Sequence, residues 1–183
     1  MFGRRPKKTA TDEPRVIADP VRARERTMNR AGRLLAAKPR SIRELRERLM
    51  EKPWTNAEIV DDVIEKLKGY KYLDDDHYAR ETALSKLRQR PQGKRRLQQS
   101  MSQKKLEKET VDSAIAQAFE ALPEEELIML AISKRLRLKG KPETREDTKK
   151  FYDYLLRQGF GYDLIREKMS EVASRSFGDS DPC

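Results

Sequence analysis

The chain has 183 residues, with 41 Lys or Arg against 31 Asp or Glu and a formal net charge of +10. Charged residues make up 39% of the chain and apolar residues only 36%, so there is little material for one thick hydrophobic core. The basic excess favours a polyanionic partner, which is DNA, RNA or an acidic protein surface. No long apolar run occurs, which excludes a signal peptide and a membrane-spanning helix.

The composition also argues against catalysis. The only cysteine is Cys183, so no intramolecular disulfide can form and the reducing cytoplasm is the expected location. The glycines form neither of the common nucleotide-binding motifs, G-x-G-x-x-G and G-x-x-x-x-G-K-[ST]. The sole histidine, His77, has no second histidine or internal cysteine with which to build a zinc site or an activated nucleophile. We therefore expect a protein that is not an enzyme and uses no cofactor or metal.

Residues 1–30 are predicted to form a flexible basic tail. They contain three prolines, nine basic and four acidic residues, and almost no large apolar side chain. Such a segment cannot bury enough surface to offset the entropy of ordering it. Two interpretations are open, an arm that follows a phosphate backbone and a solvated leader.

From residue 31 onward the apolar residues recur with helical spacing, which predicts an all-α fold. Ser41 and Thr55 are each followed three residues later by Glu, which is the capping-box pattern that begins a helix. Together with the run 31–37 they predict three short helices, none of which can fold alone.

This three-helix pattern recurs twice. Apolar positions of the first copy meet apolar residues 52 positions later, as Leu45 meets Leu97. A third copy lies 106 positions from the first, where Leu45 meets Phe151 and Asp147 takes the capping position of Ser41. Neighbouring units of such repeats cover each other's open faces, so contacts stay local in the sequence.

Each unit is expected to bury one anchor residue between its second and third helices, namely Trp54, Leu106 and Phe160. The first helix of the third unit is predicted to begin at the acidic run that starts at Glu124. The predicted organisation is a tail at residues 1–30, three-helix repeats at 31–73, 74–122 and 123–175, and a C-terminal tail at 176–183, in an elongated, curved rod.

Two runs of basic residues are the candidate contacts with a partner or DNA. The first lies between Thr82 and Leu106, holds no acidic residue, and consists of Lys86, Arg88, Arg90, Lys94, Arg95, Arg96, Lys104 and Lys105. Eight like charges repel one another, and an anionic partner would relieve that repulsion. The second run consists of Lys134, Arg135, Arg137, Lys139 and Lys141. Its structural alternative is that cations suit the negative end of a helix dipole.

Other chemistry-bearing residues have structural interpretations that we favour. The triplets Asp74–Asp76 and Glu124–Glu126 stand where helices begin, so helix capping is preferred over a magnesium site. Tyr70, Tyr72 and Tyr78 are candidates for stacking on bases, but packing within the repeat is preferred.

Four segments resemble the RecX family, whose members regulate the bacterial recombinase RecA. Residues 41–49 are similar to the second helix of the family's first repeat. Residues 69–80 (GYKYLDDDHYAR) are similar to its G-Y-L-D-D-x-x-[FY]-A signature. Either Lys71 and Tyr72 are inserted between Tyr70 and Leu73, or the signature begins at Lys71, which then stands in place of the usual glycine. Residues 92–97 resemble the G-x-x-[RK]-[IL] start of the next helix, and residues 154–165 (YLLRQGFGYDLI) resemble the C-terminal motif. The resemblance covers about residues 31–173.

The resemblance implies a monomeric negative regulator that lies in the groove of the RecA filament on single-stranded DNA. Such a protein suppresses ATP hydrolysis, strand exchange and co-protease stimulation by RecA, and so modulates DNA repair and the SOS response. The contacts named above rest on charge alone, because the resemblance carries over no site residue. Two other hypotheses are a stand-alone nucleic-acid-binding protein, for which the basic runs suffice, and a helical scaffold with no link to DNA.

Overall fold

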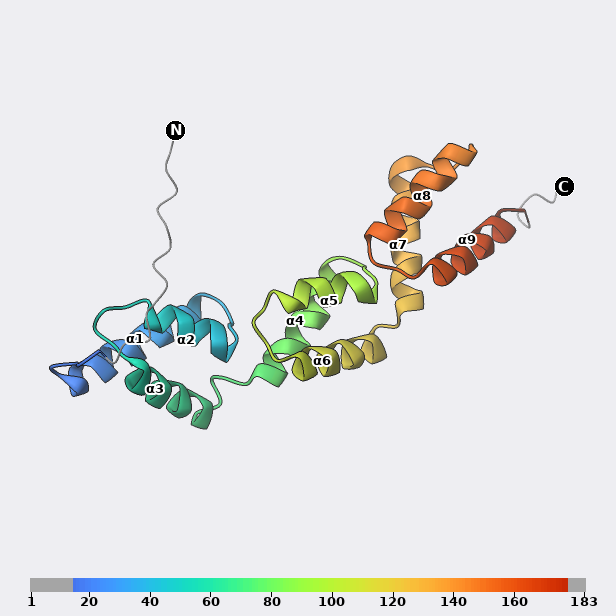
Figure 1. Ribbon diagram of the computed structural model, residues 1–183. Helices are drawn as coiled ribbons and strands as arrows, with labels where there is room; N and C mark the ends of the chain where they lie inside the picture. Colours follow the sequence, from blue (N-terminus) through green and yellow to red (C-terminus); the bar gives the residue numbers. More distant parts are fainter. Residues whose placement is uncertain (1–14, 178–183) are drawn as a thin grey trace, which may run out of the picture. The chain divides into compact units, whose positions relative to one another are not determined.

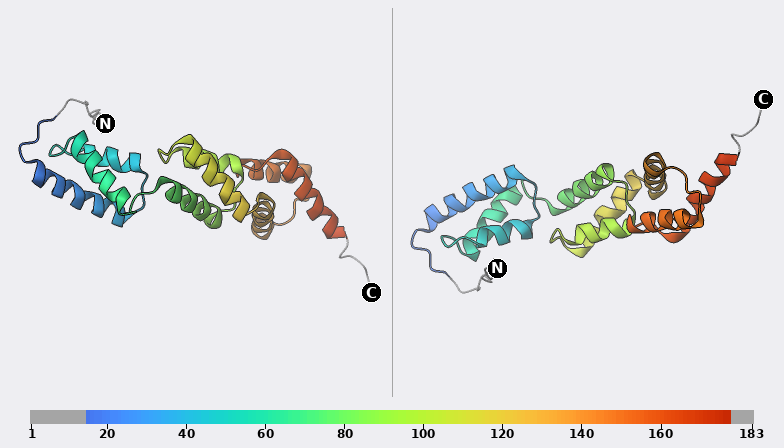
Figure 2. Two further views of the ribbon diagram at one scale, coloured as in Figure 1. Left: turned by 90° about the horizontal axis from the view of Figure 1, so that it is seen from below. Right: turned by 90° about the horizontal axis from the view of Figure 1, so that it is seen from above.

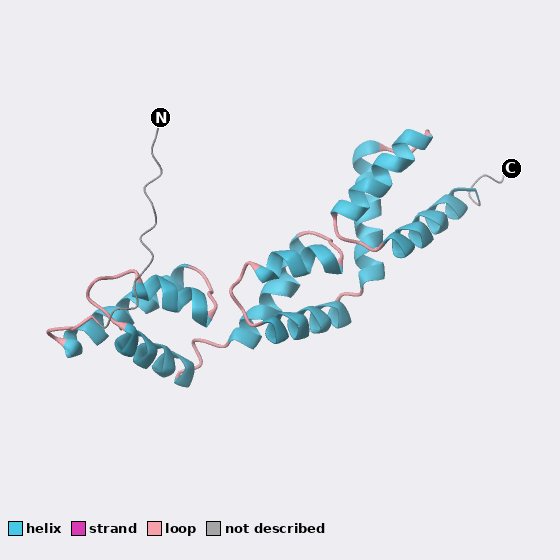
Figure 3. Cartoon of the chain, viewed as in Figure 1, coloured by secondary structure: helices cyan, strands magenta, loops and turns pink. Residues whose placement is uncertain are grey.

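The computed structural model describes residues 15–177, and within them the chain consists of helices joined by turns and loops (Figure 3). The helices come in three consecutive groups of three (Figure 1), which confirms the predicted all-α fold of three-helix repeats. A division between Tyr78 and Ala79 separates two compact units. The helices are α1 (Pro20–Ala37), α2 (Ile42–Met50), α3 (Ala57–Gly69), α4 (Asp75–Gln89), α5 (Lys94–Ser102), α6 (Lys108–Ala121), α7 (Glu124–Lys139), α8 (Arg145–Arg157) and α9 (Tyr162–Phe177).

Helix α1 begins at Pro20, so the prediction of a tail as far as residue 30 is wrong for residues 20–30. Asp19 caps the helix by accepting from the backbone N–H of Arg22 at 3.0 Å. The buried stripe of α1 is made of small residues, among them Ala23 and Thr27, and therefore gave no strong apolar signal. Both views in Figure 2 show α1 lying along α2 and α3. The predicted tail residues 1–14 and 178–183 lie outside the described residues.

The first repeat packs around leucine and valine side chains of α2 and α3. Leu45 and Leu49 from α2 meet Val60 and Val63 from α3 in one buried cluster. Ser41 caps α2 as predicted, because its Oγ accepts from the backbone N–H of Glu44 at 3.2 Å.

The cap of α3 differs from the prediction. Asn56 takes the capping position and accepts from the backbone N–H of Ile59 at 3.0 Å. Thr55 is instead buried, and the hydroxyl groups of Thr27 and Thr55 form a hydrogen bond of 3.2 Å. This hydrogen bond links the residue before the cap of α3 to α1.

The predicted correspondence between repeats matches the observed burial. Residues Leu45, Leu97 and Phe151 are all buried on the second helix of their repeats, and Ile59, Val111 and Ile165 are all buried on the third. Helices α2 and α5 begin 52 residues apart and are both nine residues long. In the third repeat the cap is Thr144 rather than the predicted Asp147, so α8 begins three residues earlier than the spacing predicts.

The three anchor positions are not buried alike. Phe160 is buried between α8 and α9, and Leu106 is partly buried against the core of its unit. Trp54 is half-buried outside the apolar cluster of the first repeat, with the guanidinium of Arg26 4.7 Å from its ring centre. The prediction of a buried anchor is therefore confirmed for Phe160 and wrong for Leu106 and Trp54, which are only half-buried, and Trp54 lies under Arg26 of α1 instead of within the apolar cluster.

The second unit has one continuous core. Buried residues of α4, α5 and α6, such as Leu87, Leu97 and Ile115, belong to the same cluster as Ile128 of α7 and Phe151 of α8. The second and third repeats therefore share a hydrophobic core. This sharing fixes α4 and α5 relative to α7 and α8.

A contact between two glycines joins the start of α5 to the loop between α8 and α9. The backbone N–H of Gly93 donates to the carbonyl oxygen of Gln158 at 2.9 Å. A Cβ atom on Gly93 would lie 2.3 Å from the carbonyl oxygen of Gly159. Gly159 itself has φ of +91°, and a Cβ there would lie 2.5 Å from the backbone nitrogen of Arg96. Only glycine fits either position without moving backbone.

We expect Gly93→Ala to lower the free energy of unfolding by about 3 kcal/mol, because the added methyl meets backbone atoms that cannot rotate away. Chemical denaturation of the full chain measures this change. Gly161→Ala is the matched control, since a Cβ there meets nothing within 4 Å, and it should cost at most about 1 kcal/mol. Equal destabilisation by the two variants would contradict the close glycine contact.

Candidate functional site

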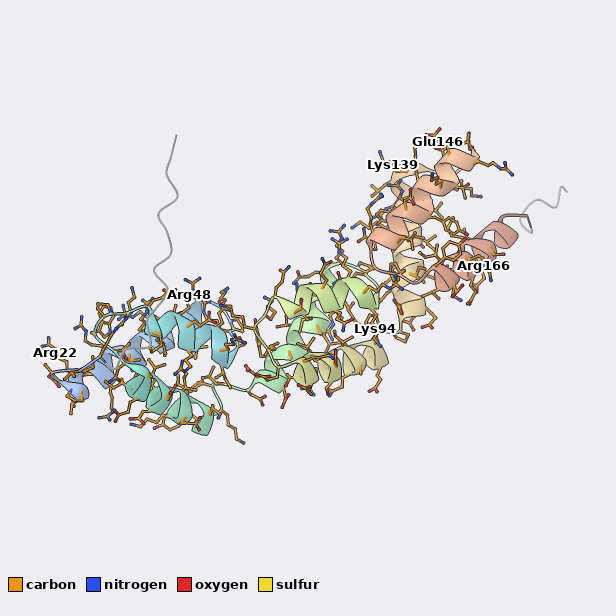
Figure 4. The ribbon with its side chains drawn as sticks, in the orientation of Figure 1. Arg22, Arg48, Lys94, Lys139, Glu146 and Arg166 are labelled. Atoms are coloured by element: carbon orange, nitrogen blue, oxygen red, sulfur yellow. The ribbon has the colours of Figure 1, made fainter. Side chains whose placement is uncertain are left out.

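The first basic run lies on the second half of α4, the start of α5 and the two loops that flank α5. Most of its side chains are exposed, and Lys86 and Lys104 are half-buried. Figure 4 shows Lys94 where α5 begins. We define the α4–α5 basic surface as Lys86, Arg88, Arg90, Lys94, Arg95, Lys104 and Lys105.

Like charges lie close together on this surface, and this proximity disfavours the charged form of Lys86. Lys86 and Lys104 are 18 residues apart, but the fold brings their charges close together. Burial, reinforced by the charge of Lys104, lowers the pKa of the Lys86 ammonium group. Arg88, Arg90 and Arg95 form no ion pair with any described residue. These three arginines therefore present positive charge that no described residue neutralises.

Arg96 is not part of the α4–α5 basic surface, because its side chain contacts the loop between α8 and α9. One of its terminal nitrogens donates to the carbonyl oxygen of Arg157 at 2.9 Å and to Oε1 of Gln158 at 3.1 Å. The side chain is half-buried against the loop between α8 and α9. The sequence around Arg96 does not predict this contact, because Gln158 is 62 residues away in the chain.

Three residues of the acidic triplets, Asp74, Asp75 and Glu124, act as helix caps. Asp74 accepts from the backbone N–H of His77 at the start of its own helix, at 2.9 Å. Asp75 reaches instead to the preceding repeat, where its carboxylate accepts from the backbone N–H of Ile42 at 2.9 Å. Glu124 does the same for α5 by accepting from the backbone N–H of Lys94 at 3.0 Å. These carboxylates bind backbone amides, in agreement with the preferred capping interpretation.

The described part of the chain contains no group of three His, Cys, Asp or Glu residues arranged to hold a metal ion. His77 is exposed. Within residues 15–177 no helix is both long and apolar enough to cross a membrane.

Two of the three tyrosines are placed differently from the preferred interpretation. Tyr70 and Tyr72 are 67% and 71% exposed, and their rings meet edge to face with centres 6.5 Å apart. Between them Lys71 takes a left-handed backbone with φ of 58°. The N–H of Tyr72 bonds to the carbonyl oxygen of Leu67, which is the Schellman ending of a helix. The prediction that these side chains pack within the repeat is therefore wrong for Tyr70 and Tyr72. Tyr78 is half-buried.

The second basic run occupies the last two turns of α7 and the loop that follows. Lys134, Arg137, Lys139 and Lys141 are exposed, and Arg135 is half-buried against α8. The guanidinium carbon of Arg135 lies 4.9 Å from the ring centre of Tyr154 and 5.9 Å from that of Phe151. Sequence reasoning missed Lys150, which α8 brings to the same end of the hairpin as Lys139 and Lys141.

The fold and this site define a class: a protein of tandem three-helix repeats that displays a broad cationic surface. Sequence models of the three RecX three-helix domains match residues 28–67, 74–115 and 123–169. The chain therefore belongs to the RecX family.

Curated relatives and solved structures agree with this assignment. The chain is 29% identical over 138 residues to the regulatory protein RecX of Clostridium botulinum and 31% identical over 134 residues to that of Finegoldia magna, covering 75% and 73% of this chain. It spans just under two thirds of those relatives, at 64% and 65% of their lengths. The crystal structure of RecX from Lactobacillus salivarius has the same fold, with a TM-score of 0.70, 20% identity, and coverage of 83% of this chain and 97% of that one.

We expect Lys86→Met to stabilise the free protein by about 0.5–1 kcal/mol, because it removes a charge that burial and Lys104 both disfavour. Urea denaturation measures the change. Arg88→Met, an exposed substitution on the same helix, should leave stability within about 0.5 kcal/mol of the parent. A loss of stability in Lys86→Met would show that this ammonium group is held by favourable contacts.

Proposed function

We propose that this protein is a negative regulator of the RecA recombinase. It binds the RecA filament on single-stranded DNA in the cytoplasm, as a monomer and without catalysing a reaction. Binding inhibits ATP hydrolysis, strand exchange and co-protease stimulation by the filament, and so restrains DNA repair and the SOS response. Membership of the RecX family supports a regulatory role.

The observation that carries the proposal is the α4–α5 basic surface. Within residues 82–106 there is no carboxylate to neutralise it, and Arg88, Arg90 and Arg95 stay exposed and without ion pairs to described residues. Such a surface fits a regular array of phosphates, whose counterions are released on binding. Arginine also forms paired hydrogen bonds to phosphate and carboxylate groups, so the same residues suit DNA and acidic patches of a filament.

The arrangement favours a partner with an extended surface over a small substrate. The cations lie on two helices and two loops of one unit, and they surround no metal group in the described chain. Glu124, next to the start of α5, is engaged as a helix cap by the backbone N–H of Lys94. The chemistry available is therefore electrostatic binding, not proton transfer or nucleophilic attack.

The decisive experiment is a titration of RecA ATPase activity on single-stranded DNA, carried out at two salt concentrations. We expect inhibition far below one molecule of this protein per recombinase monomer, because a regulator that caps or propagates along a filament affects many subunits. Inhibition that begins only when the DNA itself is coated would overturn the proposal. That outcome would favour the second candidate, a stand-alone nucleic-acid-binding protein, for which the same cationic surface suffices.

Charge reversal tests the surface directly. We expect Arg88→Glu/Arg95→Glu to need about tenfold more protein for half-inhibition, because it reverses two exposed arginines on the α4–α5 basic surface. On bare single-stranded DNA the slope of log affinity against log salt should fall by about 1.4, or about 0.7 for each lost phosphate contact.

The matched control is Lys149→Glu/Arg166→Glu, which changes the net charge equally but alters exposed residues of α8 and α9 outside both basic runs. It should retain most of the inhibition. If both double variants lose inhibition equally, net charge rather than the α4–α5 basic surface determines binding. Circular dichroism should show the same helical content in all three proteins.

A further inference from the structure

A hollow of about 560 Å³ lies between the end of α7, the loop 140–144 and the start of α8. Figure 4 shows Lys139 and Glu146 at this end of the α7–α8 hairpin. Gly140 has φ of +76° and open space around its Cβ position, so the chain turns sharply without filling the hollow. We define the hairpin hollow by its four cationic lining residues, Arg135, Lys139, Lys141 and Lys150.

Arg135 lines this hollow and also carries one buried hydrogen-bond donor without an acceptor. Its Nε atom is buried and has no hydrogen-bond partner, while its guanidinium lies against the rings of Tyr154 and Phe151. Buried N–H groups are almost always paired, so an unpaired donor beside a hollow is unusual. Stacking on the two rings holds the guanidinium in place.

The charges around the hollow favour an anion. Two acidic residues, Glu143 and Asp147, also line it. Asp147 is already engaged, because its Oδ2 accepts from the Thr144 hydroxyl at 2.7 Å. Lys150 is paired with Glu146, with Nζ and Oε1 2.8 Å apart. No described carboxylate forms an ion pair with Arg135 or Lys139.

We propose that the hairpin hollow binds a phosphate group of a nucleic-acid strand, with Arg135 donating from its guanidinium and Lys139 supplying further charge. A planar arginine beside flexible lysines is a combination that suits phosphate oxygens. The volume lies in the range of sites that enclose a small molecule, and so admits a phosphate with its attached sugar, whereas a carboxylate side chain would leave most of it empty. The inference rests on the proposed function and adds a second strand contact, on the third repeat.

The first test follows arginine Nε–H resonances of the ¹⁵N-labelled full chain by NMR during titration with inorganic phosphate. The Arg135 resonance is assigned by its absence in Arg135→Met. We expect it to shift and saturate with phosphate, while the Arg137 resonance stays in place. No shift, or an equal shift with acetate at the same ionic strength, would overturn the proposal, and the acetate result would indicate a carboxylate site for a protein partner.

The second test compares the affinity of Arg135→Met and Arg137→Met for a single-stranded oligonucleotide. Both variants remove one charge from α7, but Arg137 does not line the hollow. We expect about a tenfold loss and a salt slope reduced by about 0.7 for Arg135→Met, against less than a twofold loss for Arg137→Met. Lys139→Met, which alters an exposed side chain, should show the same direction of change without affecting folding.

Equal losses for Arg135→Met and Arg137→Met would show that the hollow is not a specific site. The proposed function fails separately, because that failure is the absence of recombinase inhibition by the parent protein. If the hollow alone is wrong, the parent still inhibits and Arg88→Glu/Arg95→Glu still weakens inhibition. If the function alone is wrong, the phosphate-induced shift of Arg135 remains while the ATPase is unaffected.

Discussion

The structure depends on carboxylates that cap a helix in the preceding repeat. Helices α2 and α5 are nine residues long, too short to be stable alone, and their first amides have no partner within the helix. Asp75 satisfies the amide of Ile42, and Glu124 satisfies the amide of Lys94. The residue that opens one repeat thus completes the second helix of the repeat before it. A run of short helices becomes stable because each repeat supplies what its neighbour lacks.

Between the second and third repeats this capping is joined by a close backbone contact. The amide of Gly93 binds the carbonyl of Gln158, and Arg96 donates to the same loop. Because the α5 terminus is held at both its cap and its backbone, the cations that follow it project from a fixed base. In the sequence Arg96 appears to be part of the basic surface. In the structure its side chain instead links α5 to the loop between α8 and α9.

Charge is handled differently along the chain. In the first repeat several arginines are paired with carboxylates, as Arg24 is with Asp62 at 3.1 Å and Arg46 with Asp61 at 2.8 Å. In the second unit Arg88 and Arg95 have no such partner among the described residues. Exposed pairs add little stability, so their distribution matters mainly for recognition. The proposed function relies on the cations of the second repeat, which lie in a stretch of the sequence without carboxylates.

The helical class and the repeat can be predicted from the sequence alone, because core positions such as Leu45 and Leu97 recur at a fixed spacing and both are buried. The sequence also indicated the basic runs, since charge is countable without a structure. It did not reveal α1 before residue 31, whose buried stripe is small residues such as Ala23, or the exposure of Tyr70, which follows from the left-handed turn at Lys71. The inward orientation of Arg96 and the position of Lys150 beside Arg135 at one hollow became visible only in the folded chain. Those outcomes depend on contacts between residues far apart in the chain, which local spacing and composition do not encode.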